Sequence, residues 1–286
     1  MPRFYFVSDL HGKQARYEKL AGSILNGSPD AVFIGGDLLP WGGIPAPNEK
    51  RRNDFIDDYL APKFGSLKKA MGGRYPRVLV IMGNDDVRIE EKKLIDASSS
   101  GIWDYVHNTK ARVMGYTVYG YAHVPPTPFR LKDWERYDVS RFVDMLAVAP
   151  EDGIFTVPVS KRELLHTTIM DELRALAGGD DMERAIFLFH APPYNTNLDR
   201  AALDGAMVNF APVDTHVGSI AIRQFIESRQ PLAALHGHIH ESARITGAWR
   251  DTIGRTQLFS AAHDGAELAL VEFDPDIPEK ARRVLL

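Results

Sequence analysis

Residues 4–11 read FYFVSDLH, a short apolar run that ends in a carboxylate, Asp9, and an imidazole, His11. Four later apolar runs end in the same way, at Gly36-Asp37, Gly83-Asn84, His190, and His236-Gly237-His238-Ile239-His240. In open α/β sheets, ligands bind in the crevice beyond the carboxyl ends of the strands, so residues that are far apart in the chain can meet there. The five runs therefore predict a hydrolytic centre that holds two metal ions.

The composition is that of an ordinary globular chain. Its 286 residues are 44% hydrophobic and 25% charged, and the formal net charge is -4. A chain with this balance has no basic footprint for nucleic acid, so we expect no bulk nucleic-acid binding. The sequence contains no cysteine. This excludes disulfides and thiolate metal sites, and it leaves imidazole, carboxylate and amide groups as the metal ligands.

The N-terminus leads directly from Met1-Pro2-Arg3 into the first apolar run, without the blocks that make up a signal peptide. No apolar stretch is long enough to span a bilayer. We therefore expect a cytoplasmic protein with no membrane partner. The sequence does not decide whether the protein forms a homo-oligomer, which stays a possibility.

The first half of the chain alternates β-type and helix-type segments. The expected elements are a strand at 3–8, a helix at 13–26, a strand at 31–35, a helix at 53–70 and a strand at 77–82. This βαβαβ order predicts parallel strands in a sheet that helices cover. A further helix is expected after Asp85-Asp86, and the β runs at 104–107, 111–114 and 116–121 are expected to pair with one another in a second sheet.

Residues 123–160 interrupt this alternation with several prolines and a charged, aromatic stretch at 129–137. A connection of this length is usually functional or disordered. Two interpretations are open for its side chains: they form a lid over a substrate, or they pack against the body or a second copy. The side chains in question are Arg130, Lys132, Trp134 and Arg136.

Regular elements are expected again after residue 160. They are a helix at 161–177, a strand at 185–189, a helix at 216–228, a strand at 232–236, and β runs at 256–260 and 268–273. The candidate ligands come from both ends of the chain, so a division of the chain into two independent domains would split the metal site. We therefore expect one domain over residues 1–286, with an irregular insertion at about 123–160.

The candidate ligands share a simple spacing. Asp9 and His11 lie two residues apart, which places their side chains on one side of an extended strand, and His238 and His240 repeat this spacing. Asp37 follows two glycines that let the backbone approach closely, and its two oxygens can bridge two cations. Taken singly, each candidate is better explained without a metal: Asn84 as a cap or turn, His190 as a core histidine, and His238 and His240 as surface histidines near a turn. Their combination and order favour metal binding.

The sequence resembles the calcineurin-like metallophosphoesterase family over nearly its whole length. The family blocks DxH, GD, GN, H and GHxH stand here as Asp9-Leu10-His11, Gly36-Asp37, Gly83-Asn84, His190 and Gly237-His238-Ile239-His240. The resemblance implies an α/β (α+β) fold, a four-layer αββα sandwich of two mixed β-sheets flanked by helices. It also implies a division of ligands: Asp9, His11 and His240 on one ion, Asn84, His190 and His238 on the other, and Asp37 between them.

A narrower similarity points to a prokaryotic Icc-type subgroup of that family. It is carried by the segments His190-Ala191-Pro192-Pro193-Tyr194, His216-Val217-Gly218-Ser219 and Pro125-Pro126-Thr127-Pro128-Phe129. The motifs of this subgroup imply no particular substrate.

The resemblance implies metal-dependent hydrolysis of a small phosphate ester. Two cations about 3.5–4 Å apart can hold a hydroxide and neutralise the attacking and leaving oxygens of an in-line displacement. We therefore expect a binuclear phosphoesterase that uses a metal-bound hydroxide and prefers phosphodiesters to monoesters. Mixed nitrogen and oxygen ligands suit manganese, iron, zinc or nickel. Manganese is the first expectation.

The chain departs from the family pattern at one position. Many members have a histidine after the Gly-Asn pair, where it can donate a proton to the leaving group, whereas this chain has Asp85. Aspartic acid has a pKa near ~3.9, and neighbouring cations favour its charged form, so Asp85 is expected to be a poor acid. His216 is the candidate substitute, because it is expected to open a helix whose free N–H groups favour phosphate. The alternative is that His216 is merely exposed.

Two other classes of function are open. A non-catalytic scaffold of the same fold would bind a protein partner, but it has no chemical need for every ligand. A binuclear hydrolase of carbon–nitrogen or carbon–oxygen bonds would keep the ligands and act on amides or lactones.

Overall fold

The computed structural model describes residues 1–41 and 54–286, and within them the strands form two six-stranded sheets and one small hairpin. The first sheet consists of β1 (Phe4–Val7), β2 (Ala31–Gly35), β3 (Arg77–Ile81), β4 (Asp104–Tyr105), β13 (Ala269–Phe273) and β14 (Arg282–Leu285). Its order is β14-β13-β1-β2-β3-β4. The strands β1 to β4 are parallel, as the βαβαβ pattern predicts, while β13 is antiparallel to β1 and β14.

The second sheet is also mixed. It consists of β5 (Thr109–Val113), β6 (Tyr116–Tyr121), β7 (Ala185–Phe189), β10 (Ala233–His236), β11 (Arg250–Ile253) and β12 (Thr256–Ser260). Its order is β11-β12-β10-β7-β6-β5. The four central strands are parallel and the two edge strands are antiparallel to their neighbours. The carboxyl ends of β6, β7, β10 and β12 therefore meet at one edge of the sheet.

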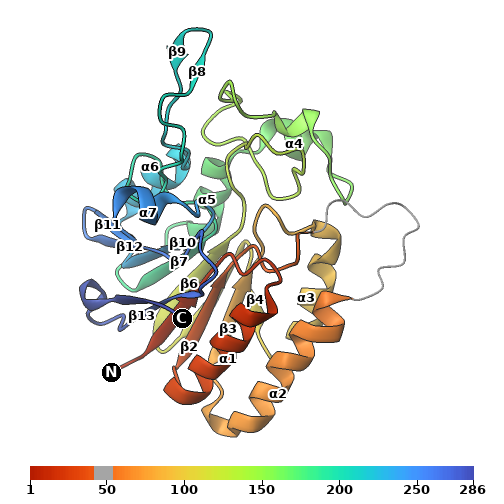
Figure 1. Ribbon diagram of the computed structural model, residues 1–286, viewed down its shortest axis with the longest axis vertical. Helices are drawn as coiled ribbons and strands as arrows, with labels where there is room; N and C mark the ends of the chain where they lie inside the picture. The colour runs from red at the N-terminus through yellow and green to blue at the C-terminus, as the bar shows by residue number, and fades with distance from the viewer. Residues whose placement is uncertain (42–53) are drawn as a thin grey trace.

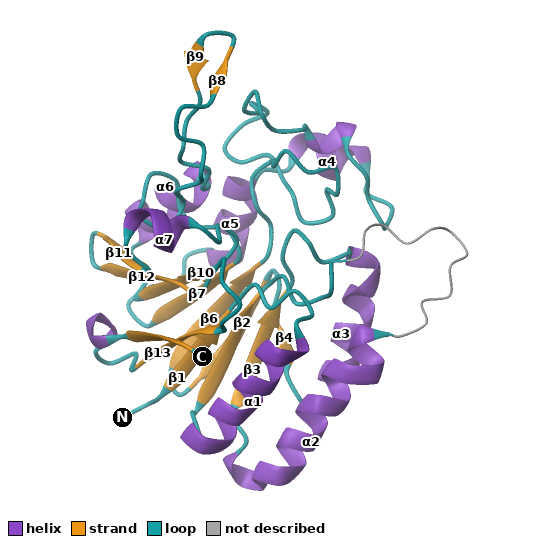
Figure 2. Ribbon diagram, viewed as in Figure 1, coloured by secondary structure: helices purple, strands orange, loops and turns teal. Residues whose placement is uncertain are grey.

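Helices cover the outer faces of the two sheets (Figure 2). The α-helices are α1 (Gln14–Gly27), α2 (Ala61–Met71), α3 (Glu91–Ser98), α4 (Lys161–His166), α5 (Ile169–Ala177), α6 (Ile220–Arg229) and α7 (Ser242–Thr246). The π-helix η1 (Phe55–Leu60) precedes α2 directly, and the short 3-10 turns are η2 (Gly72–Arg74), η3 (Arg88–Glu90), η4 (Pro150–Asp152) and η5 (Pro278–Lys280).

The alternation of side chains along β7 separates the layers. Ile186 and Leu188 belong to the core that also contains the first sheet, whereas Phe187 and Phe189 pack in a second core. The second core includes Leu173 of α5 and Phe225 of α6. Residues of α1, α2 and α3 complete the first core from its other side. The arrangement is a four-layer sandwich, so the predicted fold is confirmed.

Several predicted elements need correction. The run at 104–107 does not pair with its neighbours in the second sheet, because β4 pairs with β3 and extends the first. The predicted helix at 161–177 is divided between α4 and α5, because Thr168 caps the second helix by accepting from the Asp171 N–H. Residues 282–285, which follow the last predicted β run, form the edge strand β14. Residue 53, the expected start of one helix, lies outside the described residues.

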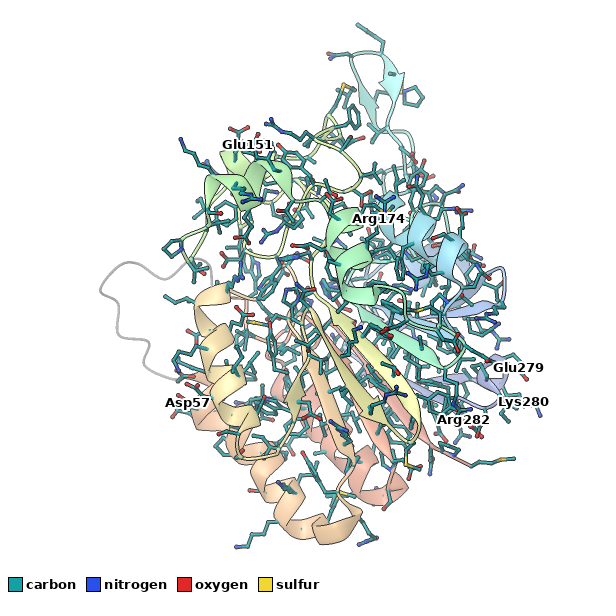
Figure 3. All side chains as sticks on the ribbon, turned by 180° about the vertical axis from the view of Figure 1, so that it is seen from behind. Asp57, Glu151, Arg174, Glu279, Lys280 and Arg282 are labelled. Carbon is teal, nitrogen blue, oxygen red and sulfur yellow. The ribbon has the colours of Figure 1, made fainter. Side chains whose placement is uncertain are left out.

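The insertion packs against the body of the protein beside α5 (Figure 3, where Glu151 and Arg174 mark the two). The side chains of Lys132, Trp134 and Arg136 are almost completely buried, at 0%, 0% and 1% exposure. Lys132 forms an ion pair with the buried Glu135. This burial contradicts the lid interpretation for these three residues and favours packing, because a buried side chain has no surface to offer a substrate. Arg130 is exposed.

A hairpin of β8 (Met207–Val208) and β9 (Ala211–Pro212) projects from the body on the second-sheet side (Figure 1). No sequence signal predicted it. Among the helices that the structure describes, none is long and apolar enough to cross a membrane.

Candidate metal centre

The predicted ligands follow the carboxyl ends of five strands that belong to both sheets. Asp9 and His11 follow β1, Asp37 follows β2, Asn84 follows β3, His190 follows β7, and His238 and His240 follow β10. Backbone hydrogen bonds hold these loops together: the Asp9 N–H donates to the Gly36 oxygen at 3.0 Å, and the Gly237 N–H donates to the His190 oxygen at 2.9 Å. The structure therefore brings residues from both ends of the chain to one place.

Four of these side chains form a compact group. Ligand atoms of Asp9, His11, Asp37 and His240 all lie within 4.8 Å of one another. The Nε2 atoms of His11 and His240 are 3.1 Å apart, and His240 Nε2 lies 3.2 Å from Asp9 Oδ1. Two imidazole nitrogens and two carboxylates that face one point are a chemically suitable set for a divalent transition metal.

A second group adjoins the first through Asp37. His190 Nε2 lies 3.0 Å from Asn84 Oδ1 and 3.4 Å from Asp37 Oδ2. The ring of His238 lies 5.2 Å from the ring of His190. The same Asp37 oxygen is 3.8 Å from His11 Nε2, so one carboxylate oxygen faces a histidine of each predicted set. Asp37 therefore adjoins both predicted sets of ligands.

The backbone of the ligand loops is in a rarely populated conformation. Asp9, His11, Asp37 and His238 have positive φ angles of 57°, 48°, 50° and 74°. Residues other than glycine seldom adopt this left-handed conformation, and such strain is concentrated at functional sites. The surrounding hydrogen bonds must hold these turns in place. The strained backbone costs stability but directs the side chains of the predicted ligands toward one another.

Two glycines allow the loops to approach the ligands. A Cβ atom on Gly36, whose φ is 97°, would lie 2.6 Å from His190 Nδ1, and a Cβ on Gly83 would lie 2.3 Å from Asp37 Oδ1. Neither position has space for a methyl group. The glycines of the Gly-Asp and Gly-Asn pairs are therefore required by the close packing of Asp37 against His190.

The buried charges of the centre shift one another's pKa values. Burial alone would lower the pKa of His190, but the carboxylates of Asp37 and Asp9 outweigh it and raise this pKa to about 10. Burial lowers the pKa of His238 to about 3, and the nearby His190 adds to the effect. A proton on His190 thus offsets buried negative charge at the position where the donor set would hold a cation. Metal binding to such a site displaces protons.

Asp85 and Asp86 have different surroundings. Asp86 is fully buried and accepts the backbone N–H groups of Leu38, Leu39 and Gly83 at 2.8 to 3.0 Å, so it joins the loops after β2 and β3. Asp85 faces the centre, with Oδ2 at 3.6 Å from His11 Nδ1. Burial and the nearby Asp37 raise the pKa of Asp85 to about 7, and bound cations would act in the opposite direction.

His216 does not open a helix, contrary to the prediction. The helix α6 begins at Ile220 with Ser219 as its cap. Its first N–H groups are already occupied, because the Asp138 carboxylate accepts from Ile220 and Ala221. The predicted phosphate site at the start of this helix is therefore wrong, because the Asp138 carboxylate of the insertion already binds these N–H groups.

His216 instead lies on the loop that precedes α6. Its Nδ1 atom is 2.8 Å from Oδ1 of the buried Asp199. The Pro192 oxygen accepts from the Ser219 N–H at 2.9 Å, so this loop lies against the segment that follows His190. His216 pairs with Arg200 in an isolated antiparallel bridge, and the Arg200 N–H donates to Ser242 Oγ, two residues after His240.

Two buried residues that hold neighbouring loops together were not predicted from the sequence. Asp199 accepts the Asn195, Thr196 and Gly218 N–H groups as well as facing His216. The guanidinium of Arg16, on the buried face of α1, donates to the backbone oxygens of Asp9 and Gly265. Neither residue stands in a motif. Asp199 contacts residues 3 to 19 positions away in the sequence, and Arg16 contacts residues 7 and 249 positions away.

Comparison with known proteins agrees with this geometry. Residues 2–242 match the profile of a family described as calcineurin-like phosphoesterases, which covers most of the chain. The protein belongs to the calcineurin-like phosphoesterase family. The family is typically dependent on two metal ions. The expected family is thereby confirmed, whereas the narrower similarity to the Icc-type subgroup stays a prediction.

Solved structures share the fold at low sequence identity. The protein TT1561 of Thermus thermophilus is 17% identical with a TM-score of 0.59, and the match covers 99% of this chain and 98% of that one. Another crystal structure is 16% identical with a TM-score of 0.62, covering 100% and 99% of the two chains. An archaeal protein described as a phosphodiesterase is 10% identical over 99% of each chain, and its TM-score of 0.45 indicates nothing about substrate. Among the curated proteins, none matches.

Proposed function

We propose that the protein is a binuclear metal-dependent phosphoesterase that hydrolyses phosphodiesters in preference to monoesters. The observation that carries this proposal is the position of Asp37 Oδ2, which faces His190 Nε2 at 3.4 Å and His11 Nε2 at 3.8 Å. A purely structural role would not require one buried carboxylate to face a histidine from each of two ligand groups. The cytoplasmic location, the single domain and the oligomeric state stay predictions.

The residues present fit two divalent ions. Asp9, His11 and His240 would hold one, Asn84, His190 and His238 would hold the other, and Asp37 would contact both. When bound, such ions activate a water molecule and neutralise charge on phosphoryl oxygens. Manganese is the proposed native metal, because the nitrogen and oxygen donors suit it and no thiolate is available to favour softer ions. The protein's own part is to fix the positions of these donors.

The preference for diesters rests on charge. A phosphomonoester carries about −1.5 to −2 charges near neutral pH, whereas a diester carries a single charge. The Asp85 carboxylate faces the centre where many relatives have a histidine, and it repels the more highly charged ester more strongly. The missing histidine also leaves no proton donor at this position, which favours esters with good leaving groups.

Metal removal tests the proposal. We expect a chelator followed by gel filtration to abolish hydrolysis of bis(p-nitrophenyl) phosphate, and Mn²⁺ to restore more activity than Zn²⁺ or Ni²⁺. Metal content should return to two ions per chain. The panel includes p-nitrophenyl phosphate, an amide and a lactone. Turnover of the amide or lactone alone would favour the carbon–nitrogen or carbon–oxygen hydrolase, and metal binding without any turnover would favour the scaffold.

We propose that His216 donates the proton to the leaving group. The buried Asp199 orients its Nδ1 atom, which leaves Nε2 on the opposite side of the ring. An imidazole held in this way is the usual geometry of a general acid. The position of its loop, between the segments that follow His190 and His240, supports this role.

Replacement of His216 by alanine should lower kcat for alkyl phosphodiesters by about 10²–10⁴-fold, the usual contribution of general acid catalysis. An aryl diester needs little protonation and should lose much less. The matched control is His166→Ala, at an exposed position on α4, which should change neither rate. An equal loss on both kinds of ester would contradict the proton-donor role, and so would no loss on the alkyl ester.

A further inference from the structure

Asp85 contacts three of the proposed ligands. Its backbone N–H donates to Asp37 Oδ1 at 2.9 Å. Its side-chain Oδ1 accepts from the Asn84 Nδ2 group at 2.9 Å, and its Oδ2 lies 3.6 Å from His11 Nδ1. These contacts come from one residue whose side chain is only about a quarter exposed. They suggest a role for Asp85 beyond the absence of a histidine.

The contact with Asn84 fixes the orientation of its amide. An asparagine side chain ends in an oxygen and a nitrogen of similar size, and only the oxygen can bind a cation. Because Asp85 accepts from Nδ2, the amide oxygen is turned toward His190, with Oδ1 at 3.0 Å from His190 Nε2. Without that acceptor, the amide would lose the contact that distinguishes its two ends.

The contact with His11 has a similar effect on the imidazole. The separation of 3.6 Å is longer than a hydrogen bond, but a carboxylate on the Nδ1 side is the arrangement that commonly orients a histidine whose Nε2 binds a metal. His11 Nε2 points to the ligand group, 3.1 Å from His240 Nε2. Asp85 thus faces the outer nitrogen of His11 while the inner nitrogen faces the centre.

We infer that Asp85 is a positioning residue that orients one ligand of each metal ion, His11 for the first and Asn84 for the second. This inference rests on the proposed function. It explains what an aspartate does at position 85, where many members of the family have a histidine. The two carboxylate oxygens of Asp85 face one ligand of each group. Asp85 thus orients ligands and does not donate a proton to the leaving group. The two ions are then expected to depend on the same side chain.

Two substitutions separate the contacts. Asparagine has one acceptor oxygen where aspartate has two, so Asp85→Asn can serve Asn84 or His11 but not both. We expect Mn²⁺ titration by calorimetry to show one ion bound about 10–100-fold more weakly in Asp85→Asn, and both ions weakened by this factor in Asp85→Ala, as is typical for the loss of groups that orient ligands. Asp152→Asn, the same change at an exposed position, should match the unchanged protein.

Thermal unfolding of the metal-free variants shows whether Asp85 positions the metal ligands or stabilises the fold. We expect the unfolding midpoint of Asp85→Asn to match that of the unchanged protein while its Mn²⁺ affinity falls. Unchanged affinity for both ions in Asp85→Ala would overturn the inference, and so would a lowered midpoint without a change in affinity. If the unchanged protein binds two ions and the variants lose them, but no phosphate ester is hydrolysed, the proposed function fails and the inference stands. If the unchanged protein binds no metal, both fail.

Discussion

Replacement of Asp37 by asparagine is expected to lower kcat/KM for phosphodiesters by at least about 10²-fold, since a single preorganised electrostatic contact can contribute about 10²–10³-fold. Asp37 Oδ2 faces a histidine from each ligand group. An amide has one oxygen and no charge, so it cannot neutralise two cations. We expect the variant to retain fewer than two ions after gel filtration, as elemental analysis would measure.

The same substitution should leave the fold intact. Asparagine tolerates the left-handed backbone that Asp37 adopts, with φ at 50°. Its amide oxygen can also accept the Asp85 N–H that Asp37 Oδ1 accepts now. Circular dichroism of Asp37→Asn should therefore match that of the control Asp152→Asn. Two retained ions together with turnover close to that of the unchanged protein would refute the bridging role.

The sequence predicts the fold well where local pattern and global structure agree. The buried strands at 31–35 and 185–189 have the predicted bounds, because continuous apolar runs followed by glycine or histidine leave few alternatives. Parallel strands place the ligand loops at one edge of each sheet, and the packing of the two sheets in a common core brings the two edges together. The positions of Asp9, Asp37 and His190 were accessible from the sequence for this reason.

The features that the sequence could not predict depend on contacts between residues that are distant in the chain. The strand β4 has only two residues and belongs to the first sheet because β3 is next to it in space. The charge of Lys132 suggested an exposed side chain, but Glu135 neutralises it in the interior. Asp138, from the insertion, accepts the first N–H groups of α6, a helix that begins at Ile220 and not at His216. Each case is a tertiary contact that overrides a local preference.

Replacement of Gly83 by alanine is expected to disrupt the centre by steric conflict alone. The added Cβ would lie 2.3 Å from Asp37 Oδ1, 2.6 Å from the Asp37 backbone nitrogen and 2.6 Å from His190 Cε1. The φ angle of Gly83 lies outside the left-handed region, so alanine adds no backbone strain. Forcing an extra methyl into a packed interior costs about 1–3 kcal/mol. Because Asp37 and His190 must move apart to relieve the clash, the bound metal and the turnover should be lost together.

Gly65 provides the control for this prediction. It lies in α2, and a Cβ there would meet no other atom within 4 Å. Alanine in a helix interior is favoured over glycine by roughly 0.5–1 kcal/mol, so Gly65→Ala should unfold at a slightly higher temperature with unchanged metal content. Gly83→Ala should unfold at a lower temperature in the metal-free state and bind fewer than two ions. If Gly83→Ala binds two ions and hydrolyses diesters at the rate of Gly65→Ala, the close approach of the β3 loop to Asp37 is not required for the centre.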